Sequence, residues 1–175
     1  MSFTCVVVTV SDGVSAGTRD DVSGPTAAQM LADAGLEVVR RELVADELDE
    51  ISALLTALST EGVALVVTTG GTGFGPRDVT PEATRAVLDR EAPGLASLML
   101  QAGLAHTPNA ALSRAVAGVA GSTLIINLPG SPKGVSESLE AVLEVVPHAL
   151  GLLGGDTGAH PTGHRQPSDG AGAES

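Results

Sequence analysis

Short apolar runs alternate along the chain with segments in which apolar residues recur every three or four positions. Apolar runs bounded by turn residues are typical of buried strands, whereas the wider spacing gives a helix one apolar face. We therefore expect strands at residues 4–10, 37–44, 64–68, 116–119 and 122–128. Helices are expected to begin at Ser23-Gly24-Pro25, after Asp46, at Thr80-Pro81, at Leu95 and after Lys133.

The alternation of strands and helices predicts the fold class. Helical connections between strands place those strands in parallel, so we expect an α/β fold with a mostly parallel sheet covered on both faces. The last two strands are joined only by Ala120-Gly121 and should form a hairpin at the edge of the sheet. In the final helical segment, Pro147 should kink the helix or restart it.

Composition divides the chain into two parts. At 175 residues it is long enough for one domain with a substantial core. From Gly154 onward Gly, Pro, His, Ser and Asp dominate, and apolar residues show no period. We therefore expect an α/β domain over residues 1–153 and a disordered tail over residues 154–175.

Polar residues follow four of the expected strands, at the point where each strand ends. Ser11-Asp12 follow the first strand, Asp46 the second, residues 70–78 the third and residues 127–133 the last. Ligands of open parallel sheets bind outside the carboxyl ends of the strands. Each loop alone has an ordinary structural explanation, but four polar loops at one edge predict a binding site there.

The segment Gly70-Gly71-Thr72-Gly73, called the glycine loop below, lies between a buried strand and the helix expected at Thr80. Glycines let backbone N–H groups approach an anion closely, and the N-terminus of the next helix adds partial positive charge. Neither the dinucleotide pattern nor the Walker pattern fits these residues. Two interpretations stay open: a phosphate-binding loop of another type, or a tight strand-to-helix turn.

The distribution of charge indicates which ligands the protein can bind. The net charge of −12 argues against nucleic acid as a partner, because nucleic-acid binding requires a basic face. The one lysine, Lys133, and three of the eight arginines, Arg19, Arg77 and Arg114, fall in loop stretches that carry glycine or serine. This pattern predicts a local anion site in an acidic protein.

The sequence also indicates a cellular location. No apolar run is long enough to span a bilayer, and the first residues lack the basic region of a signal peptide. The single cysteine, Cys5, lies in an apolar strand and is expected to be a buried, inert thiol. We therefore expect a cytoplasmic protein that does not bind membranes.

Two aspartates at the ends of strands differ in their simplest explanation. Asp46 fits the N-cap of the following helix, a role worth ~1 kcal/mol, with Asp49 at the third helical position. Asp78 precedes Thr80, which is the better cap, so the cap explanation does not account for Asp78.

Five motifs, in the expected order over residues 4–153, together resemble the molybdopterin-binding Mog/MoaB family. The motifs are Thr9-Val10-Ser11-Asp12, Thr68-Thr69-Gly70-Gly71-Thr72-Gly73, Arg77-Asp78-Val79-Thr80-Pro81-Glu82-Ala83, Ser113-Arg114 and Asn127-Leu128-Pro129-Gly130-Ser131-Pro132-Lys133. Five separate matches are much more specific than any one of them. The resemblance implies a three-layer α/β/α domain with a mostly parallel five-stranded sheet, assembled as a homotrimer or as a hexamer made of two trimers.

The resemblance also implies an activity in molybdenum cofactor biosynthesis, with molybdopterin and ATP as substrates. A molybdopterin adenylyltransferase transfers the adenylyl group of ATP to the phosphate of molybdopterin and releases pyrophosphate. Asp46 and Asp78 match the catalytic pair of the family, and carboxylates are natural ligands for Mg²⁺. The substrate-binding residues implied by the matching motifs are Ser11, Asp12, Thr69, Gly70, Gly71, Thr72, Gly73, Arg114, Asn127, Pro129, Gly130, Ser131, Pro132 and Lys133.

Two alternative functions stay open at this point. One is a non-catalytic molybdopterin carrier or scaffold of the same fold, and the other is a nucleotide pyrophosphatase-type enzyme resembling a domain of the competence-damage protein. The presence of both Asp46 and Asp78 favours the transferase. Because the chain has no Trp or Tyr and only Phe3 and Phe74, ring recognition must come from backbone, aliphatic contacts or Phe74.

Overall fold

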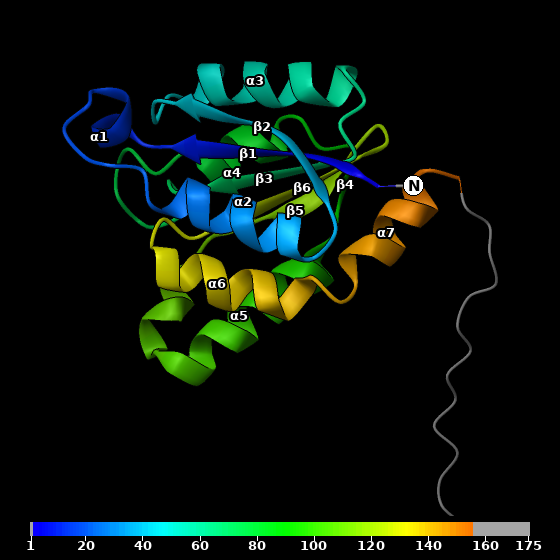
Figure 1. Cartoon of the computed structure of the whole chain (residues 1–175). Coiled ribbons are helices and arrows are strands. Elements are labelled where there is room, and N and C mark those ends of the chain that lie inside the picture. Colours follow the sequence, from blue (N-terminus) through cyan, green and yellow to red (C-terminus); the bar gives the residue numbers. More distant parts are fainter. Residues whose placement is uncertain (1, 156–175) are drawn as a thin grey trace, which may run out of the picture.

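The computed structural model describes residues 2–155, and within them six strands form one sheet (Figure 1). The strand order is β2-β1-β3-β6-β5-β4, and the first four strands in this order are parallel. Parallel pairing places the carboxyl ends of these four strands at one edge. In chain order the strands are β1 (Thr4–Val10), β2 (Glu37–Val44), β3 (Leu65–Thr69), β4 (Arg90–Glu91), β5 (Ala117–Ala120) and β6 (Thr123–Leu128).

Helices cover both faces of the sheet, which confirms the expected three-layer α/β/α architecture (Figure 1). The helices α2, α5, α6 and α7 pack on one face, and α3 and α4 pack on the other. Alternate residues of β1 enter the two cores, because successive side chains of a strand point to opposite faces. The helices are α1 (Asp12–Ser15), α2 (Ser23–Asp33), α3 (Leu48–Thr60), α4 (Thr80–Arg85), α5 (Pro93–His106), α6 (Pro132–Val142) and α7 (Val146–Leu153), with a 3-10 helix η1 at Pro108–Leu112.

The sheet has six strands rather than the five expected. The additional strand, β4, pairs antiparallel with β5 through only two residues, both charged, which carry no strand pattern in the sequence. The helix that begins at Thr80 therefore ends at Arg85. Its continuation is replaced by sheet pairing, in which the backbone N–H of Asp89 donates to the carbonyl of Val119 at 2.8 Å. The β5–β6 hairpin is confirmed, but β4 and not β5 forms the edge.

Two helix starts differ from their expected capping. The residue before α3 is Glu47, no side chain caps this helix, and Asp46 lies one residue further out. Thr80 is the first residue of α4 and its hydroxyl does not cap the helix. In both cases the side chain bonds to a distant loop instead. The restart at Pro147 is confirmed, because α6 ends at Val142 and α7 begins at Val146.

Three further expectations from the sequence concern the cysteine, membrane-spanning helices and the C-terminal tail. Cys5 is buried, and burial raises the pKa of its thiol to about 11, as expected for an inert cysteine. Among residues 2–155, no helix combines the length and apolar character needed to cross a membrane. Of the tail expected at residues 154–175, residues 156–175 lie outside the described part of the chain.

Candidate active site

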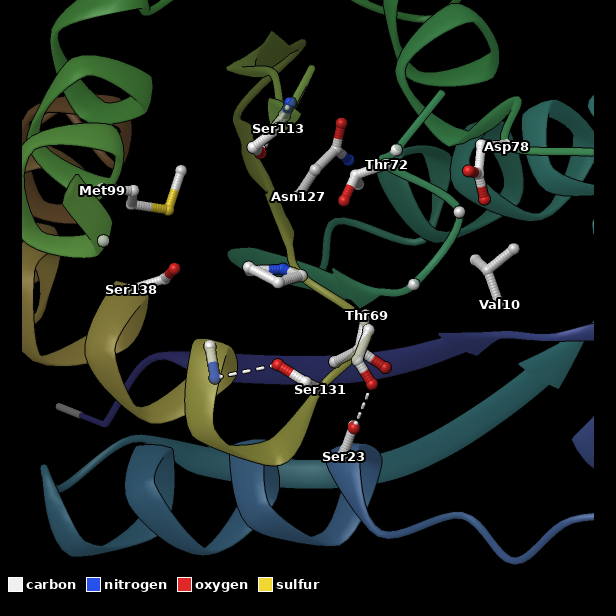
Figure 2. Close-up of a pocket in the computed structure, with 18 of the residues that line it drawn as sticks. Val10, Ser23, Thr69, Thr72, Asp78, Met99, Ser113, Asn127, Ser131 and Ser138 are labelled. Carbon is white, nitrogen blue, oxygen red and sulfur yellow. Dashed lines mark hydrogen bonds between the residues drawn. The ribbon is translucent and has the colours of Figure 1, made fainter. Parts of the chain in front are cut away.

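A cavity of about 1240 Å³ opens at the carboxyl ends of the parallel strands (Figure 2). The loops after β1, β2, β3 and β6 all contribute to its wall. The structure thus brings together fourteen of the sixteen residues implied by the sequence motifs. They are Ser11, Asp46, Thr69, Gly70, Gly71, Thr72, Gly73, Asp78, Asn127, Pro129, Gly130, Ser131, Pro132 and Lys133. Asp12 and Arg114 do not line the cavity.

The conformation of the glycine loop requires two of its glycines. Gly70 and Gly71 have φ angles of 95° and 63°, which side chains rarely adopt. A Cβ on Gly70 would also clash with the carbonyl of Val10, and one on Gly71 with the hydroxyl of Thr80. Thr80 fixes this turn, because its buried hydroxyl donates to the carbonyl of Gly70 at 2.9 Å. The backbone N–H of Thr80 donates to the carbonyl of Gly71 at 3.1 Å.

Asp46 joins the loops after β1 and β2. Its Oδ2 accepts a hydrogen bond from the backbone N–H of Asp12 at 2.8 Å, and its own N–H donates to Oδ1 of Asp12 at 3.0 Å. The other oxygen, Oδ1, would lie 2.9 Å from a Cβ on Gly71, so the carboxylate faces the glycine loop. Its simplest explanation from sequence, a helix cap, is therefore wrong, because the side chain turns away from α3.

Burial and neighbouring charges set the pKa of Asp46. Partial burial raises this pKa, and the nearby carboxylates of Asp12 and Asp78 raise it further, whereas the hydrogen bond from Asp12 lowers it. For Asp12 the direction is opposite, because hydrogen bonding to the Arg77 guanidinium lowers the pKa of its carboxyl. Arg77 bridges Asp12 and Glu47 at 3.0 and 2.6 Å at the exposed rim. Asp12 is thus engaged with protein groups rather than facing the cavity.

Asp78 contacts the glycine loop at Gly73. Its Oδ2 accepts a hydrogen bond from the backbone N–H of Gly75 at 2.8 Å. A Cβ on Gly73 would lie 2.9 Å from the same oxygen. Both aspartates therefore contact the glycine loop so closely that side chains at Gly71 and Gly73 would displace them. Phe74, by contrast, is 67% exposed and does not line the cavity.

Arg114 bonds to the glycine loop without lining the cavity. Its Nε donates to the carbonyl of Gly73 at 2.7 Å, and a terminal nitrogen donates to the carbonyl of Asp78 at 2.5 Å. A second terminal nitrogen pairs with Glu82, and the backbone N–H of Arg114 donates to the carbonyl of Thr72 at 2.9 Å. Since all of these partners belong to the protein, Arg114 acts here as a positioning residue.

Asn127 lines the cavity, but its side-chain amide nitrogen and oxygen both bond to other protein groups. Its amide nitrogen donates to the hydroxyls of Thr68 and Thr84, both at 2.9 Å, and its Oδ1 accepts from the backbone N–H of Val116 at 3.2 Å. This network ties β6 to β3 and α4. Thr69 differs: its buried hydroxyl has no hydrogen-bond partner among residues 2–155, which leaves it free for a ligand.

The N-terminus of α6 lines the cavity through Ser131, Pro132 and Lys133. Ser131 caps this helix by accepting from the backbone N–H of Gly134 at 3.1 Å (Figure 2). Ser23, at the start of α2, donates to the carbonyl of Gly130 at 2.6 Å and fixes the loop before α6. From the sequence, Ser23 has only a helix-starting role, since its partner lies 107 residues away.

Sequence reasoning missed the part of the cavity formed by helices. Met99 and Leu100 of α5 and Glu137 and Ser138 of α6 line it together with the loops. In Figure 2, Met99 and Ser138 lie on the opposite side of the view from Asp78. The sequence signal for this part is the apolar stripe of Leu95, Leu98, Met99 and Ala102, which fits a core or a subunit interface equally well.

Comparisons with known proteins agree with this geometry. The sequence profile of the family described as "Probable molybdopterin binding domain" matches residues 6–148. A molybdopterin adenylyltransferase of Helicobacter pylori is 42% identical over 86% of this chain and 87% of its own length. The molybdenum cofactor synthesis protein cinnamon of Drosophila melanogaster is also 42% identical, over 89% of this chain, but the chain spans only 26% of that protein.

A solved structure shows the same likeness. The molybdopterin biosynthesis enzyme MoaB from Thermus thermophilus matches with a TM-score of 0.83 and 55% identity, over 87% of this chain and 97% of that one. These matches confirm the resemblance carried by the five sequence motifs. The chain belongs to the molybdopterin-binding family of molybdenum cofactor biosynthesis proteins.

Proposed function

We propose that this protein is a molybdopterin adenylyltransferase that acts through Asp46, Asp78 and the glycine loop. The phosphate oxygen of molybdopterin attacks the α-phosphorus of ATP. A new phosphorus–oxygen bond forms, the bond from the α-phosphorus to the oxygen bridging to the β-phosphorus breaks, and pyrophosphate leaves. Relatives of similar length that carry this name support the proposal.

The loops after β3 and β6 bind the phosphates. The left-handed turn at Gly70 and Gly71 keeps side chains away from the backbone, so that amide groups can face an anion. Thr69 offers a buried hydroxyl without a partner in residues 2–155, and the N-terminus of α6 adds partial positive charge. Lys133, 79% exposed at the start of α6, is free to swing toward a phosphate.

The two aspartates fit a Mg²⁺ ion bound together with phosphate. Each uses one oxygen in a backbone hydrogen bond, and the other, Oδ1, accepts none within residues 2–155. Among those residues there is no cluster of three or more acidic, His or Cys ligands. Mg²⁺ commonly binds through one or two carboxylates plus substrate phosphates and water, so two are sufficient. When bound, the ion would neutralise charge on the transferring phosphoryl group.

The main contribution of the protein to this reaction is to position the two substrates. Phosphoryl transfer needs the attacking and leaving oxygens in line, and the rigid loops supply fixed anion sites. The hydrogen bonds of Thr80 and Arg114 keep the glycine loop in place before substrates arrive. The observation that carries the proposal is the placement of Asp46 and Asp78 against the same loop.

A direct assay separates the three candidate functions. Purified protein is mixed with molybdopterin, ATP and Mg²⁺, and pyrophosphate is measured together with adenylylated molybdopterin. We expect pyrophosphate release that requires molybdopterin. Binding of molybdopterin without pyrophosphate release would establish the carrier instead. Cleavage of a nucleotide at equal rates with and without molybdopterin would establish the pyrophosphatase.

We also propose that the protein is a homotrimer, alone or paired into a hexamer. The family resemblance supports this assembly, and so do two leucines that α5 exposes away from the cavity, Leu98 and Leu104, which are 39% and 45% accessible. Light scattering at micromolar concentration should give three or six times the mass of one chain, and a monomer would refute the proposal. A cytoplasmic location stays a prediction from the sequence.

A further inference from the structure

The cavity has a second half that the reaction scheme above does not use. Its wall is formed by Ala96, Met99 and Leu100 of α5 and by Glu137 and Ser138 of α6. The α5 side of this half is mainly apolar, whereas the α6 side carries the polar side chains of Lys133, Glu137 and Ser138. The whole cavity, at about 1240 Å³, is larger than the roughly 300–1,000 Å³ typical of a site for one ligand. The second half therefore offers space for a flat ring system beside the nucleotide.

Glu137 is the exceptional residue of this wall. Its side chain is only 13% exposed, and Oε1 is buried without a hydrogen bond from any of residues 2–155. Two basic groups lie near that oxygen, Lys133 Nζ at 3.7 Å and His106 Nδ1 at 3.6 Å, but both distances exceed hydrogen-bond reach. Both basic side chains are more than half exposed, so Glu137 is the buried member of the group. A buried acceptor without a donor is costly, and a ligand N–H would satisfy it.

The shape of a carboxylate indicates which ring it can bind. Its two oxygens pair best with two adjacent donors in one plane. The pyrimidine edge of a pterin presents such a pair, the 2-amino group beside N3–H. Adenine presents one amino group beside the acceptor N1, which a carboxylate repels. Glu137 thus matches a pterin and discriminates against adenine.

We propose that Glu137 binds the 2-amino and N3–H edge of the pterin and places that ring between α5 and α6. This inference rests on the proposed function and adds to it the orientation of the two substrates. With the pterin in the helical half, the adenine of ATP is left to the loops after β1 and β2. It also explains how the ring is recognised without Trp or Tyr: apolar side chains of α5 cover it, and one carboxylate of α6 orients it.

The test uses two phosphate-free probes, so that contacts of Lys133 with phosphate do not enter. The probes are 6-hydroxymethylpterin and 6-hydroxymethyllumazine, in which a carbonyl replaces the 2-amino group. The unchanged protein should bind the pterin about 10- to 100-fold more tightly than the lumazine, because a hydrogen bond to a charged group contributes about this much to affinity. Glu137→Gln should reduce this preference to less than about 3-fold, because the amide offers only one acceptor. The affinity for ATP should not change.

Two control variants separate recognition from structure. Glu140→Gln changes an exposed carboxylate of the same helix, and His106→Gln removes the partner of Glu137 on α5. Both should keep the preference for the pterin. Equal binding of the two probes by the unchanged protein would overturn the inference, and so would a preference that survives in Glu137→Gln. Loss of the preference in His106→Gln as well would overturn it too, because Glu137 would then serve the packing of α5 on α6.

Failure of this inference and failure of the proposed function give different results. Pyrophosphate release that does not depend on Glu137, with equal binding of both probes, refutes the pterin contact and keeps the adenylyl transfer. A clear preference for the pterin in a protein that releases no pyrophosphate keeps the contact and refutes the transfer.

Discussion

The two halves of the cavity differ in how their polar groups are bonded. In the loop half, polar side chains bond to the backbone of neighbouring loops, as Thr80 does to Gly70 and Asp46 to Asp12. In the helical half, the α5 lining is mainly apolar, and Glu137 of α6 has a buried oxygen without a hydrogen bond from residues 2–155. Most polar groups of the first half are already bonded to the protein, apart from the Thr69 hydroxyl, whereas the second half presents a buried carboxylate oxygen that a ligand N–H would satisfy.

This difference separates two kinds of effect. Rigid loops that hold anions govern the chemical step, since phosphoryl transfer depends on alignment. The apolar side chains of α5 together with the carboxylate of Glu137 on α6 govern which ring enters. Changes in the loop half should therefore lower turnover with little effect on the binding of a phosphate-free pterin. The predictions below test this separation in order of decreasing effect.

The largest effect is expected for the two aspartates. Asp46→Asn and Asp78→Asn each remove a full negative charge from the glycine loop with almost no change in shape. Pyrophosphate release should fall by at least ~10²-fold, while the fold and pterin binding persist. Asp49→Asn, at an exposed position in the first turn of α3, is the matched control and should leave turnover unchanged. Near-normal turnover in both variants would discard the catalytic assignment and favour a carrier.

A second prediction distinguishes two glycines of the same loop. Gly73→Ala places a Cβ 2.9 Å from Asp78 Oδ2, so it should displace that carboxylate and lower turnover by about 10- to 100-fold. Gly71→Ala forces a side chain into φ of 63° against Thr80 and should in addition cost ~1–3 kcal/mol of stability. Turnover assays and thermal unfolding of both variants measure the two effects. Equal loss of stability in both would contradict the distinct roles assigned to these positions.

A third prediction concerns the bond that fixes the loop. Thr80→Val keeps the size of the side chain but leaves the carbonyl of Gly70 without its buried donor. The free energy of unfolding should fall by about 1–3 kcal/mol. Thr56→Val is the control, because that exposed threonine bonds only within its own helix. If both variants unfold at the same temperature, the organisation of the loop half does not depend on Thr80.

The smallest effect is a shift in pH dependence. Burial raises the pKa of Asp46, and the positive charge of Arg77 partly opposes this rise. Arg77→Leu should raise this pKa further, so that turnover is lost at a higher pH as the solution is acidified. The shift should be small, because Arg77 is about half exposed and screened by salt. Arg41→Leu, an exposed change on β2, should leave the acid limb of the pH–rate profile in place. A shift in the opposite direction would show that Arg77 does not act on Asp46 through its charge.

Several structural features were predictable because their signals are local. The apolar run of β1 and the stripe of α3 specify strand and helix through their periods alone. The glycine loop was predictable because Gly70 and Gly71 adopt angles that other residues avoid. Parallel connections then place four loops at one edge by topology, without any knowledge of packing.

Other features depend on partners far away in the chain. The cap assigned to Asp46 was a sound local interpretation, but its carboxylate bonds to the backbone of Asp12, 34 residues earlier. The two-residue strand β4 exists only because β5 offers a free edge, and its charged residues carry no strand pattern. Local propensity cannot detect either partner.

The order of the elements other than α1 and β4, the family and the loops that surround the cavity could be inferred from the amino-acid sequence. The spacing of apolar residues, the residues of turns and the spacing of motifs are properties of neighbouring residues, so they can be recognised without a structure. The folded chain was needed to show that Arg114 and Asn127 bond to the protein itself, and that Glu137 is a buried acceptor in the cavity wall. Burial and hydrogen-bond satisfaction depend on which distant groups packing brings into contact, and no local pattern in the sequence encodes that.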